Sequence, residues 1–151
     1  MKILMVCLGN ICRSPMAEGI LSKKIKQNGL NWIVESAGTA EYHVGEAPHH
    51  LSQKVSLLHG IDISQQKCRQ FKATDLIFFD HIYAMDQSNY ANIRKMSDDN
   101  WNEKKVDLIL NELFPFENKE VPDPWYGGEE GFHEVFDLLN KACDKIIEKF
   151  K

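Results

Sequence analysis

The residues best suited to chemistry lie in one short segment near the N-terminus, Cys7–Ser14 (C-L-G-N-I-C-R-S). An apolar run precedes this segment and a helix-like pattern follows it, so it should be a strand-to-helix loop. Free N–H groups and partial positive charge at a helix N-terminus bind anions. Gly9 and Asn10 tolerate the left-handed backbone that turns successive amides inward. The planar guanidinium of Arg13 matches two phosphate oxygens.

Cys7 stands at the start of this loop, where the amides would stabilise a thiolate. A thiolate that faces a bound phosphate indicates attack at phosphorus and a phosphocysteine intermediate. The chain contains no G-x-x-x-x-G-K-[S/T] motif, so this is not a nucleotide-binding loop of the Walker type. A lone cysteine is more often a small buried apolar residue. The loop around Cys7 favours the nucleophile instead.

The rest of the chain predicts the elements that position this loop. Strands are expected over residues 2–6, 32–36, 81–85 and 106–110. Four helices are expected. The first begins with Ser14 as its N-cap and stops at Asn28-Gly29, the second covers 48–59, the third follows a cap at Asp86, and the fourth covers 132–150. This alternation predicts a parallel sheet with right-handed crossovers and helices on both faces. The functional crevice of such a sheet lies beyond the carboxyl ends of its strands.

Composition limits the class of protein. The chain has 151 residues, 18 Lys+Arg against 22 Asp+Glu, a net charge of −4 and 43% hydrophobic residues. One globular domain over residues 1–151 is expected, and the acidic balance argues against nucleic acid as a partner. The longest apolar run, Ile3–Leu8, is six residues long, whereas a membrane span needs about 20. We therefore expect a cytoplasmic protein with no membrane partner, signal peptide or disulfide framework.

The stretch Val6–Glu18 (V-C-L-G-N-I-C-R-S-P-M-A-E) resembles the signature of the low-molecular-weight protein tyrosine phosphatase family. Three later segments resemble motifs of that family in the same order: Glu35–Thr39, Met85–Asn89 (M-D-Q-S-N) and Val121–Tyr126 (V-P-D-P-W-Y). The similarity covers essentially the full chain. It implies a phosphotyrosine phosphatase I-like α/β fold of three layers, α/β/α, in which the central layer is a four-stranded parallel sheet of order 2-1-3-4.

The resemblance also implies an activity, the hydrolysis of phosphotyrosine and other aryl phosphate monoesters. Cys7 would be the nucleophile and Arg13 would bind phosphate. Asp123 would be the general acid and then the base, because a phenol with a pKa near ~10 leaves poorly without a proton. The loop residues that would surround the phosphate are Leu8, Gly9, Asn10, Ile11, Cys12 and Ser14. No metal or organic cofactor is expected, and the partners would be tyrosine-phosphorylated proteins or small aryl phosphates.

Aromatic residues would form the substrate slot that the family implies. Tyr42, Trp125 and Tyr126 would stack against a phenyl phosphate. Many family members have Trp at the position of Tyr42. Two consecutive tyrosines are common in the family where this chain has Trp125 and Tyr126. Asn10, Ser14 and Ser36 would hold the loop in shape, and Ser14 could donate a hydrogen bond to the thiolate. Gln66 stands where the family often has a histidine bonded to the loop asparagine.

Several alternatives stay open. Cys12 either traps the oxidised Cys7 as a disulfide, as the family implies, or only packs beneath the loop. A thiol-dependent arsenate reductase and a non-catalytic phosphate-binding module would share the loop, and phosphoarginine competes with phosphotyrosine as substrate. The oligomeric state is open. The histidines at 43, 49, 50 and 59 form no zinc motif, and adjacent His49 and His50 should point apart on a helix.

Overall fold

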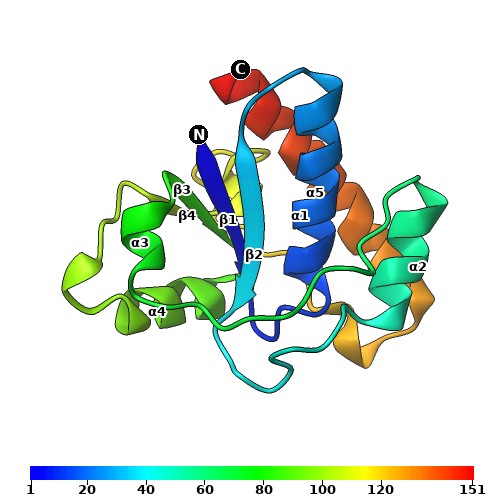
Figure 1. Ribbon diagram of the computed structural model, residues 1–151, viewed down its shortest axis with the longest axis horizontal. Helices are drawn as coiled ribbons and strands as arrows, with labels where there is room; N and C mark the ends of the chain where they lie inside the picture. Colours follow the sequence, from blue (N-terminus) through cyan, green and yellow to red (C-terminus); the bar gives the residue numbers. More distant parts are fainter.

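The computed structural model describes all residues, Met1–Lys151. Its strands are β1 (Lys2–Cys7), β2 (Ile33–Gly38), β3 (His81–Ala84) and β4 (Val106–Leu108). They form one parallel sheet of order β2-β1-β3-β4, which confirms the predicted order (Figure 1). The α-helices are α1 (Arg13–Gln27), α2 (His50–Leu58), α3 (Asp75–Phe78), α4 (Gln87–Met96) and α5 (Glu129–Phe150). Three 3-10 helices are η1 (Asp98–Asn100), η2 (Ile109–Asn111) and η3 (Pro124–Tyr126).

Helices cover both faces of the sheet, as the alternation of elements predicts. Alternate residues of β1 enter two separate apolar clusters. Ile3 and Met5 join the larger cluster with α1, α2 and α5, whereas Leu4 and Val6 join the smaller one with α3 and α4. Figure 1 shows these two groups of helices on opposite sides of the strands. Burial on both faces explains why β1 is a continuous apolar run without polar alternation.

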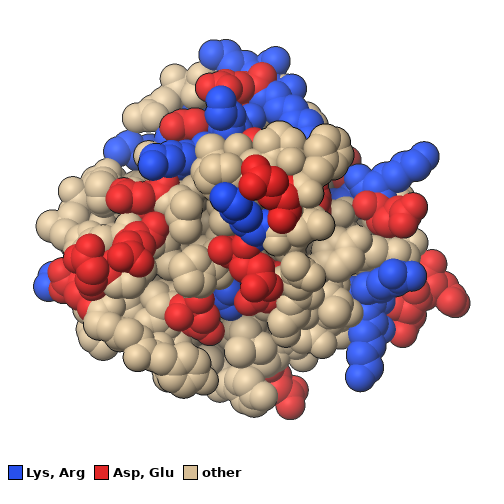
Figure 2. Space-filling view, turned by 180° about the vertical axis from the view of Figure 1, so that it is seen from behind, with Lys and Arg blue, Asp and Glu red and all other residues tan.

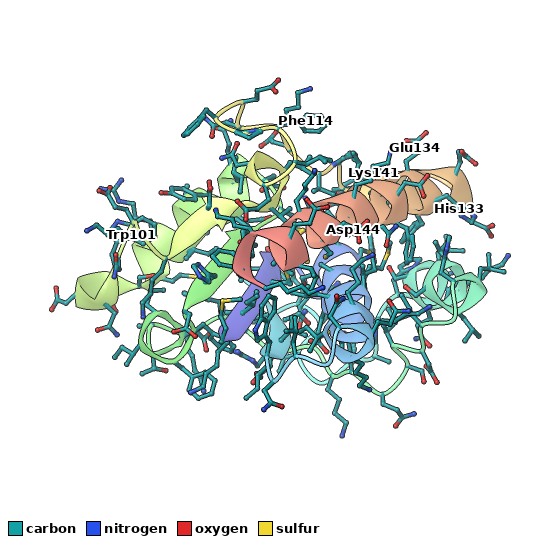
Figure 3. All side chains as sticks on the ribbon, turned by 90° about the horizontal axis from the view of Figure 1, so that it is seen from above. Trp101, Phe114, His133, Glu134, Lys141 and Asp144 are labelled. Carbon is teal, nitrogen blue, oxygen red and sulfur yellow. The ribbon has the colours of Figure 1, made fainter.

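The long C-terminal helix α5 follows its sequence pattern closely. Its inward residues, from Phe132 to Ile147, are buried against the sheet and α1. Glu134, Lys141 and Asp144 lie exposed on its outer side (Figure 3). Across the face opposite to the view of Figure 1, acidic and basic side chains intermingle (Figure 2). No helix of the structure has the length and apolar character that crossing a membrane requires.

Some predicted boundaries were wrong. The first helix begins at Arg13 with Cys12 as its N-cap, not with Ser14, because the Ser14 hydroxyl faces Cys7 and the carbonyl of Ala37 instead of the helix amides. The second strand continues two residues beyond Ser36, and the fourth ends at Leu108, where the chain turns into η2. Neither α3 nor the 3-10 helices were predicted.

The loop after β1 lies against the end of β2. In Figure 1 the N-terminus is at the top, and this loop is at the lower edge of the sheet. Cys7 pairs in register with Gly38. A Cβ atom at Gly38 would lie 2.8 Å from the Leu8 oxygen and 2.9 Å from the Asn10 nitrogen. Only glycine allows the backbones to approach this closely. The loop therefore packs directly against the backbone of β2 at Gly38.

Candidate active site

One pocket collects most of the predicted site residues at the carboxyl edge of the sheet. Its lining residues are Cys7, Leu8, Gly9, Ile11, Cys12, Arg13, Tyr42, His43, Asp123, Trp125 and Tyr126. Ten of these eleven are predicted from the sequence, and His43 is not. The side chains of the other two predicted loop residues, Asn10 and Ser14, do not line the pocket and are buried. Segments that are far apart in the chain thus meet around Cys7.

The carbonyl groups of the loop point away from the pocket and are held from behind. Those of Cys7 and Leu8 accept hydrogen bonds from the amides of Thr39 and Ala40, at 3.0 and 2.9 Å. The remaining bonds run from Cys68 Sγ to the Asn10 oxygen (2.7 Å), from the His49 amide to the Ile11 oxygen (2.8 Å), and from Ser52 Oγ to the Cys12 oxygen (3.2 Å). The loop is therefore fixed by three surrounding segments.

The amides of the same loop have no acceptor in the protein. No backbone or side-chain group accepts a hydrogen bond from the N–H groups of Leu8 to Cys12. Asn10 has a left-handed φ of 57°, as its residue type predicts. Gly9 does not use its conformational freedom; a Cβ there would lie 3.2 Å from Cδ2 of His43. Successive amides without acceptors form a concave site for an anion.

A chain of polar contacts runs from Cys7 into the protein. Cys7 Sγ lies 3.1 Å from Ser14 Oγ. Asn10 Nδ2 donates to Ser14 Oγ at 2.9 Å and to Ser36 Oγ at 3.0 Å. Ser36 Oγ donates to Glu18 Oε1 at 2.8 Å, and burial raises the pKa of the Glu18 carboxyl. The structure thus places the three polar residues that were predicted to shape the loop in direct contact, and it adds Glu18.

Gln66 does not bond to the loop asparagine. Its Nε2 donates to the Pro15 carbonyl at 3.1 Å. Asn10 Oδ1 instead accepts from the backbone amide of Arg69 at 2.9 Å. A main-chain donor therefore bonds to Asn10 where the family often has a histidine side chain.

Arg13 is buried and firmly oriented. Its Nη1 donates to Asp86 Oδ2 at 2.7 Å and to the carbonyl of Val121 at 3.0 Å, and its side chain is 3% exposed. Burial opposes the positive charge, but Cys7, Asp86 and Asp123 nearby outweigh it and raise the pKa of the guanidinium. The sequence predicts Asp86 only as a helix cap. Its second role depends on a partner 73 positions away, for which no local signal exists.

Asp123 lies at the other side of the pocket. It caps η3, where its Oδ1 accepts from the Trp125 amide at 3.0 Å. Its Oδ2 lies 3.8 Å from Nη2 of Arg13. Tyr42 and Tyr126 line the pocket but are 74% and 91% exposed, so these two aromatic residues form a rim at the mouth. Trp125, at 44%, is the least exposed of the three.

All four cysteines are free thiols. Burial raises the pKa of Cys12 to about 12, with a further contribution from Cys7. Burial also raises the pKa of Cys68 to about 12, and its thiol lies under the loop at the Asn10 oxygen. Cys143 lies in the core on the inner side of α5. The thiol of Cys12 lines the pocket and is nearly buried.

The histidines show one departure from expectation. His49 and His50 do not point apart: their rings stack with centroids 4.4 Å apart. The reason is that His49 is the N-cap of α2 and lies outside the helix, where helical spacing does not apply. No group of three or more His, Cys, Asp and Glu side chains is arranged to hold a metal ion.

Comparisons with known proteins agree with this geometry. A model of the family described as low molecular weight phosphotyrosine protein phosphatase matches residues 2–151. PtpA of Staphylococcus aureus, a low molecular weight protein-tyrosine-phosphatase, is 41% identical over 147 residues, which cover 97% of this chain and 91% of PtpA. A protein tyrosine phosphatase structure from Entamoeba histolytica aligns with a TM-score of 0.91 and 39% identity, covering 99% and 96% of the chains. A Drosophila arginine phosphatase aligns with a TM-score of 0.92 and 32% identity, covering 100% and 98%.

Proposed function

Because this chain belongs to the low molecular weight phosphotyrosine protein phosphatase family, a family of cysteine-dependent phosphatases, we propose that it hydrolyses phosphotyrosine and other aryl phosphate monoesters through a phosphocysteine at Cys7. The observation that carries the proposal is the run of amides from Leu8 to Cys12. They have no protein acceptor, and four of the five residues line a pocket together with Cys7 and Arg13. This arrangement suits a group with several anionic oxygens.

In the first step the Cys7 thiolate attacks phosphorus. The S–P bond forms, the bond from phosphorus to the phenolic oxygen breaks, and Asp123 gives its proton to that oxygen. The loop amides and Arg13 hold the equatorial phosphate oxygens as their charge redistributes. Two observations support this role for Asp123: it lines the same pocket as Cys7, and its Oδ1 accepts from the Trp125 amide at the start of η3.

In the second step water attacks the phosphocysteine. Asp123 takes a proton from the water, the new O–P bond forms, and the S–P bond breaks to return the thiolate and inorganic phosphate. Ser14 Oγ, 3.1 Å from Cys7 Sγ, donates to the departing thiolate. The reaction as proposed needs no metal or organic cofactor, since nucleophile, acid and phosphate-binding groups all come from the chain.

The proposal extends to the setting of the enzyme. We assign residues 1–151 to one catalytic domain in the cytoplasm. Its substrates are tyrosine-phosphorylated proteins or small aryl phosphates, held by Tyr42, Trp125 and Tyr126 at the pocket mouth. Aromatic rings at the mouth favour a phenyl group through stacking.

Phosphoarginine is the second candidate substrate. The fold of the Drosophila arginine phosphatase matches this chain over its full length. A phosphotyrosine peptide and a phosphoarginine peptide of the same sequence distinguish the two, because the aromatic rim should favour the phenyl ring. Arsenate reduction would need a downstream cysteine pair, whereas Cys143 is in the core and Cys68 lies beneath the loop.

Hydrolysis of p-nitrophenyl phosphate by the wild type, Cys7→Ser and Asp123→Asn tests the proposal. We expect wild-type turnover in a reducing buffer without metal and its abolition in Cys7→Ser. With phenyl phosphate as a second substrate, whose leaving group needs the acid, we expect a rate about 10²-fold or more lower in Asp123→Asn, the range for general acid catalysis. An inactive wild type, or a Cys7→Ser variant with full activity, would overturn it.

A further inference from the structure

The Trp125 ring contacts two imidazole rings. The His43 ring lies tilted at 45° with its centroid 5.7 Å from that of Trp125. The His49 ring meets Trp125 edge to face at 5.4 Å. Both are favourable aromatic arrangements. The neighbouring Tyr126 is almost fully exposed, so contacts of Trp125 and of the buried Pro124 hold η3 in place.

Three contacts hold His49 in place. Its backbone amide donates to the Ile11 carbonyl of the phosphate-binding loop at 2.8 Å. Its Nδ1 accepts from the Leu51 amide at 3.1 Å and so caps α2. Its ring stacks on Phe132 of α5 with centroids 5.0 Å apart. The ring that supports Trp125 is thus fixed to the loop, to α2 and to α5 at once.

The neutral form of His49 suits this position. Burial lowers the pKa of its imidazole, and electrostatic interaction with His50 and His43 lowers it further. An acceptor at Nδ1 also requires an unprotonated nitrogen, and the N-terminus of a helix disfavours a cation. His49 therefore meets Trp125 as an uncharged aromatic ring.

Trp125 in turn fixes the carboxyl group of Asp123. The Trp125 amide donates to Asp123 Oδ1 at 3.0 Å. This leaves Oδ2 toward the pocket, 3.8 Å from Arg13. A general acid must approach the leaving oxygen to about 2.6–3.2 Å, so a small displacement of η3 would remove the acid from reach.

We propose that His49 is a positioning residue for the acid step: its ring supports Trp125 and thereby aims the Asp123 carboxyl at the leaving-group oxygen. This inference rests on the proposed function, because it concerns the proton that Asp123 delivers there. His43 also contacts Trp125, but it lines the pocket as well, so its substitution would change substrate contacts. His49 is the residue that isolates the effect.

Two substitutions separate the ring from the helix cap. His49→Asn keeps an oxygen that can cap α2 but removes the aromatic ring. His49→Phe keeps a ring and removes the cap. His59→Asn is the matched control, because the His59 ring stacks on Phe136 at 4.1 Å and makes no contact with Trp125. A loss that follows the ring and not the cap identifies the contact with Trp125.

The readout is kcat/KM for two aryl phosphates. The phenol leaves readily from p-nitrophenyl phosphate, whereas phenyl phosphate depends on an acid because its phenol has a pKa near about 10. For His49→Asn we expect kcat/KM to fall about tenfold with phenyl phosphate and less than about twofold with p-nitrophenyl phosphate. His49→Phe and His59→Asn should both keep the wild-type ratio between the substrates.

A double variant tests whether the effect passes through Asp123. If it does, His49→Asn/Asp123→Asn loses no more activity on phenyl phosphate than Asp123→Asn alone. Equal losses on both substrates, or losses that multiply in the double variant, would overturn the inference while leaving the proposed function standing. An inactive wild type or an active Cys7→Ser would instead overturn the proposed function itself.

Discussion

Arg13 and Asp86, 73 positions apart in the sequence, form an ion pair in which Nη1 lies 2.7 Å from Oδ2. The other carboxylate oxygen of Asp86 accepts from the Asn89 amide at 2.8 Å and caps α4. One carboxylate therefore anchors a helix and orients the guanidinium that lines the pocket. Arg13 is held in place before any phosphate group arrives, which reduces the entropy lost on binding.

Asp86→Asn should weaken the binding of inorganic phosphate about tenfold, since a hydrogen bond to a charged group contributes roughly 1.5–3 kcal/mol. The asparagine oxygen can still cap α4, but the NH2 group then faces Arg13, and this group donates hydrogen bonds and cannot accept one. The inhibition constant of phosphate against p-nitrophenyl phosphate measures the change. Asp144→Asn, which removes an exposed carboxylate paired with Lys24, should leave this constant unaltered. No change in Asp86→Asn would show that the ion pair does not prepare Arg13.

Ser14→Ala should slow the return of the thiolate from the phosphocysteine. The hydroxyl of Ser14 lies 3.1 Å from Cys7 Sγ and is oriented by Asn10, so its loss removes a donor to the leaving sulfur. We expect kcat on p-nitrophenyl phosphate to fall about tenfold, within the range for losing one charge-assisted hydrogen bond. Rapid mixing should show a burst of nitrophenol close to the enzyme concentration. Ser22→Ala, on the same helix, is the control; a slow steady rate without a burst would assign Ser14 to the first step.

Gly38→Ala should distort the loop without touching any proposed catalytic group. The new Cβ would lie 2.8–2.9 Å from three backbone atoms of the loop, and backbone cannot move aside as a side chain can. We expect a loss of about 1–3 kcal/mol in unfolding free energy, as for overpacked sites, and a raised KM. Gly128→Ala, where a Cβ would meet nothing within 4 Å, is the matched control in denaturant unfolding. Equal stability of the two variants would refute the close approach.

The fold could be predicted where one pattern decides an element. The apolar run of β1 and the spacing of α5 have a single interpretation, because each buries its whole pattern against the sheet. The four-residue helix α3 could not be predicted, since it is too short for a helical period to show. The prediction of Ser14 as N-cap was wrong because the loop brings the Cys7 thiol close, and the Ser14 hydroxyl contacts this thiol instead of a helix amide.

The site was predictable as far as motifs extend along the chain. Six loop residues and Asp123 line one pocket, whereas the loop residues Asn10 and Ser14 are buried away from it. His43 and Glu18 were missed, because each acts through contacts that only the fold creates: His43 against Gly9 and Trp125, and Glu18 through Ser36. No spacing in the sequence signals such contacts between separate segments.

Glu18 leads to a prediction about pH. Its carboxyl accepts from Ser36, yet burial and the negative charge of Glu35 raise its pKa above the ordinary value of 4.5. Folding therefore tightens the binding of this proton. The stability that follows is fully present below the unfolded pKa and is lost as the pH rises through the folded pKa. At neutral pH the folded protein thus holds a carboxylate that would be better hydrated in the unfolded chain.

Glu18→Gln should raise the Tm at about pH 8 and lose that advantage toward pH 4, because glutamine matches the protonated acid in shape but does not titrate. The glutamine oxygen can still accept from Ser36, so the hydrogen bond between Ser36 and Asn10 of the loop should persist. Thermal unfolding of both proteins across this range measures the difference. Glu148→Gln, at an exposed position on α5, controls for the change in net charge. If Glu18→Gln is less stable than the wild type at every pH, the carboxylate stabilises the network behind the loop, and the burial of Glu18 is not a source of instability.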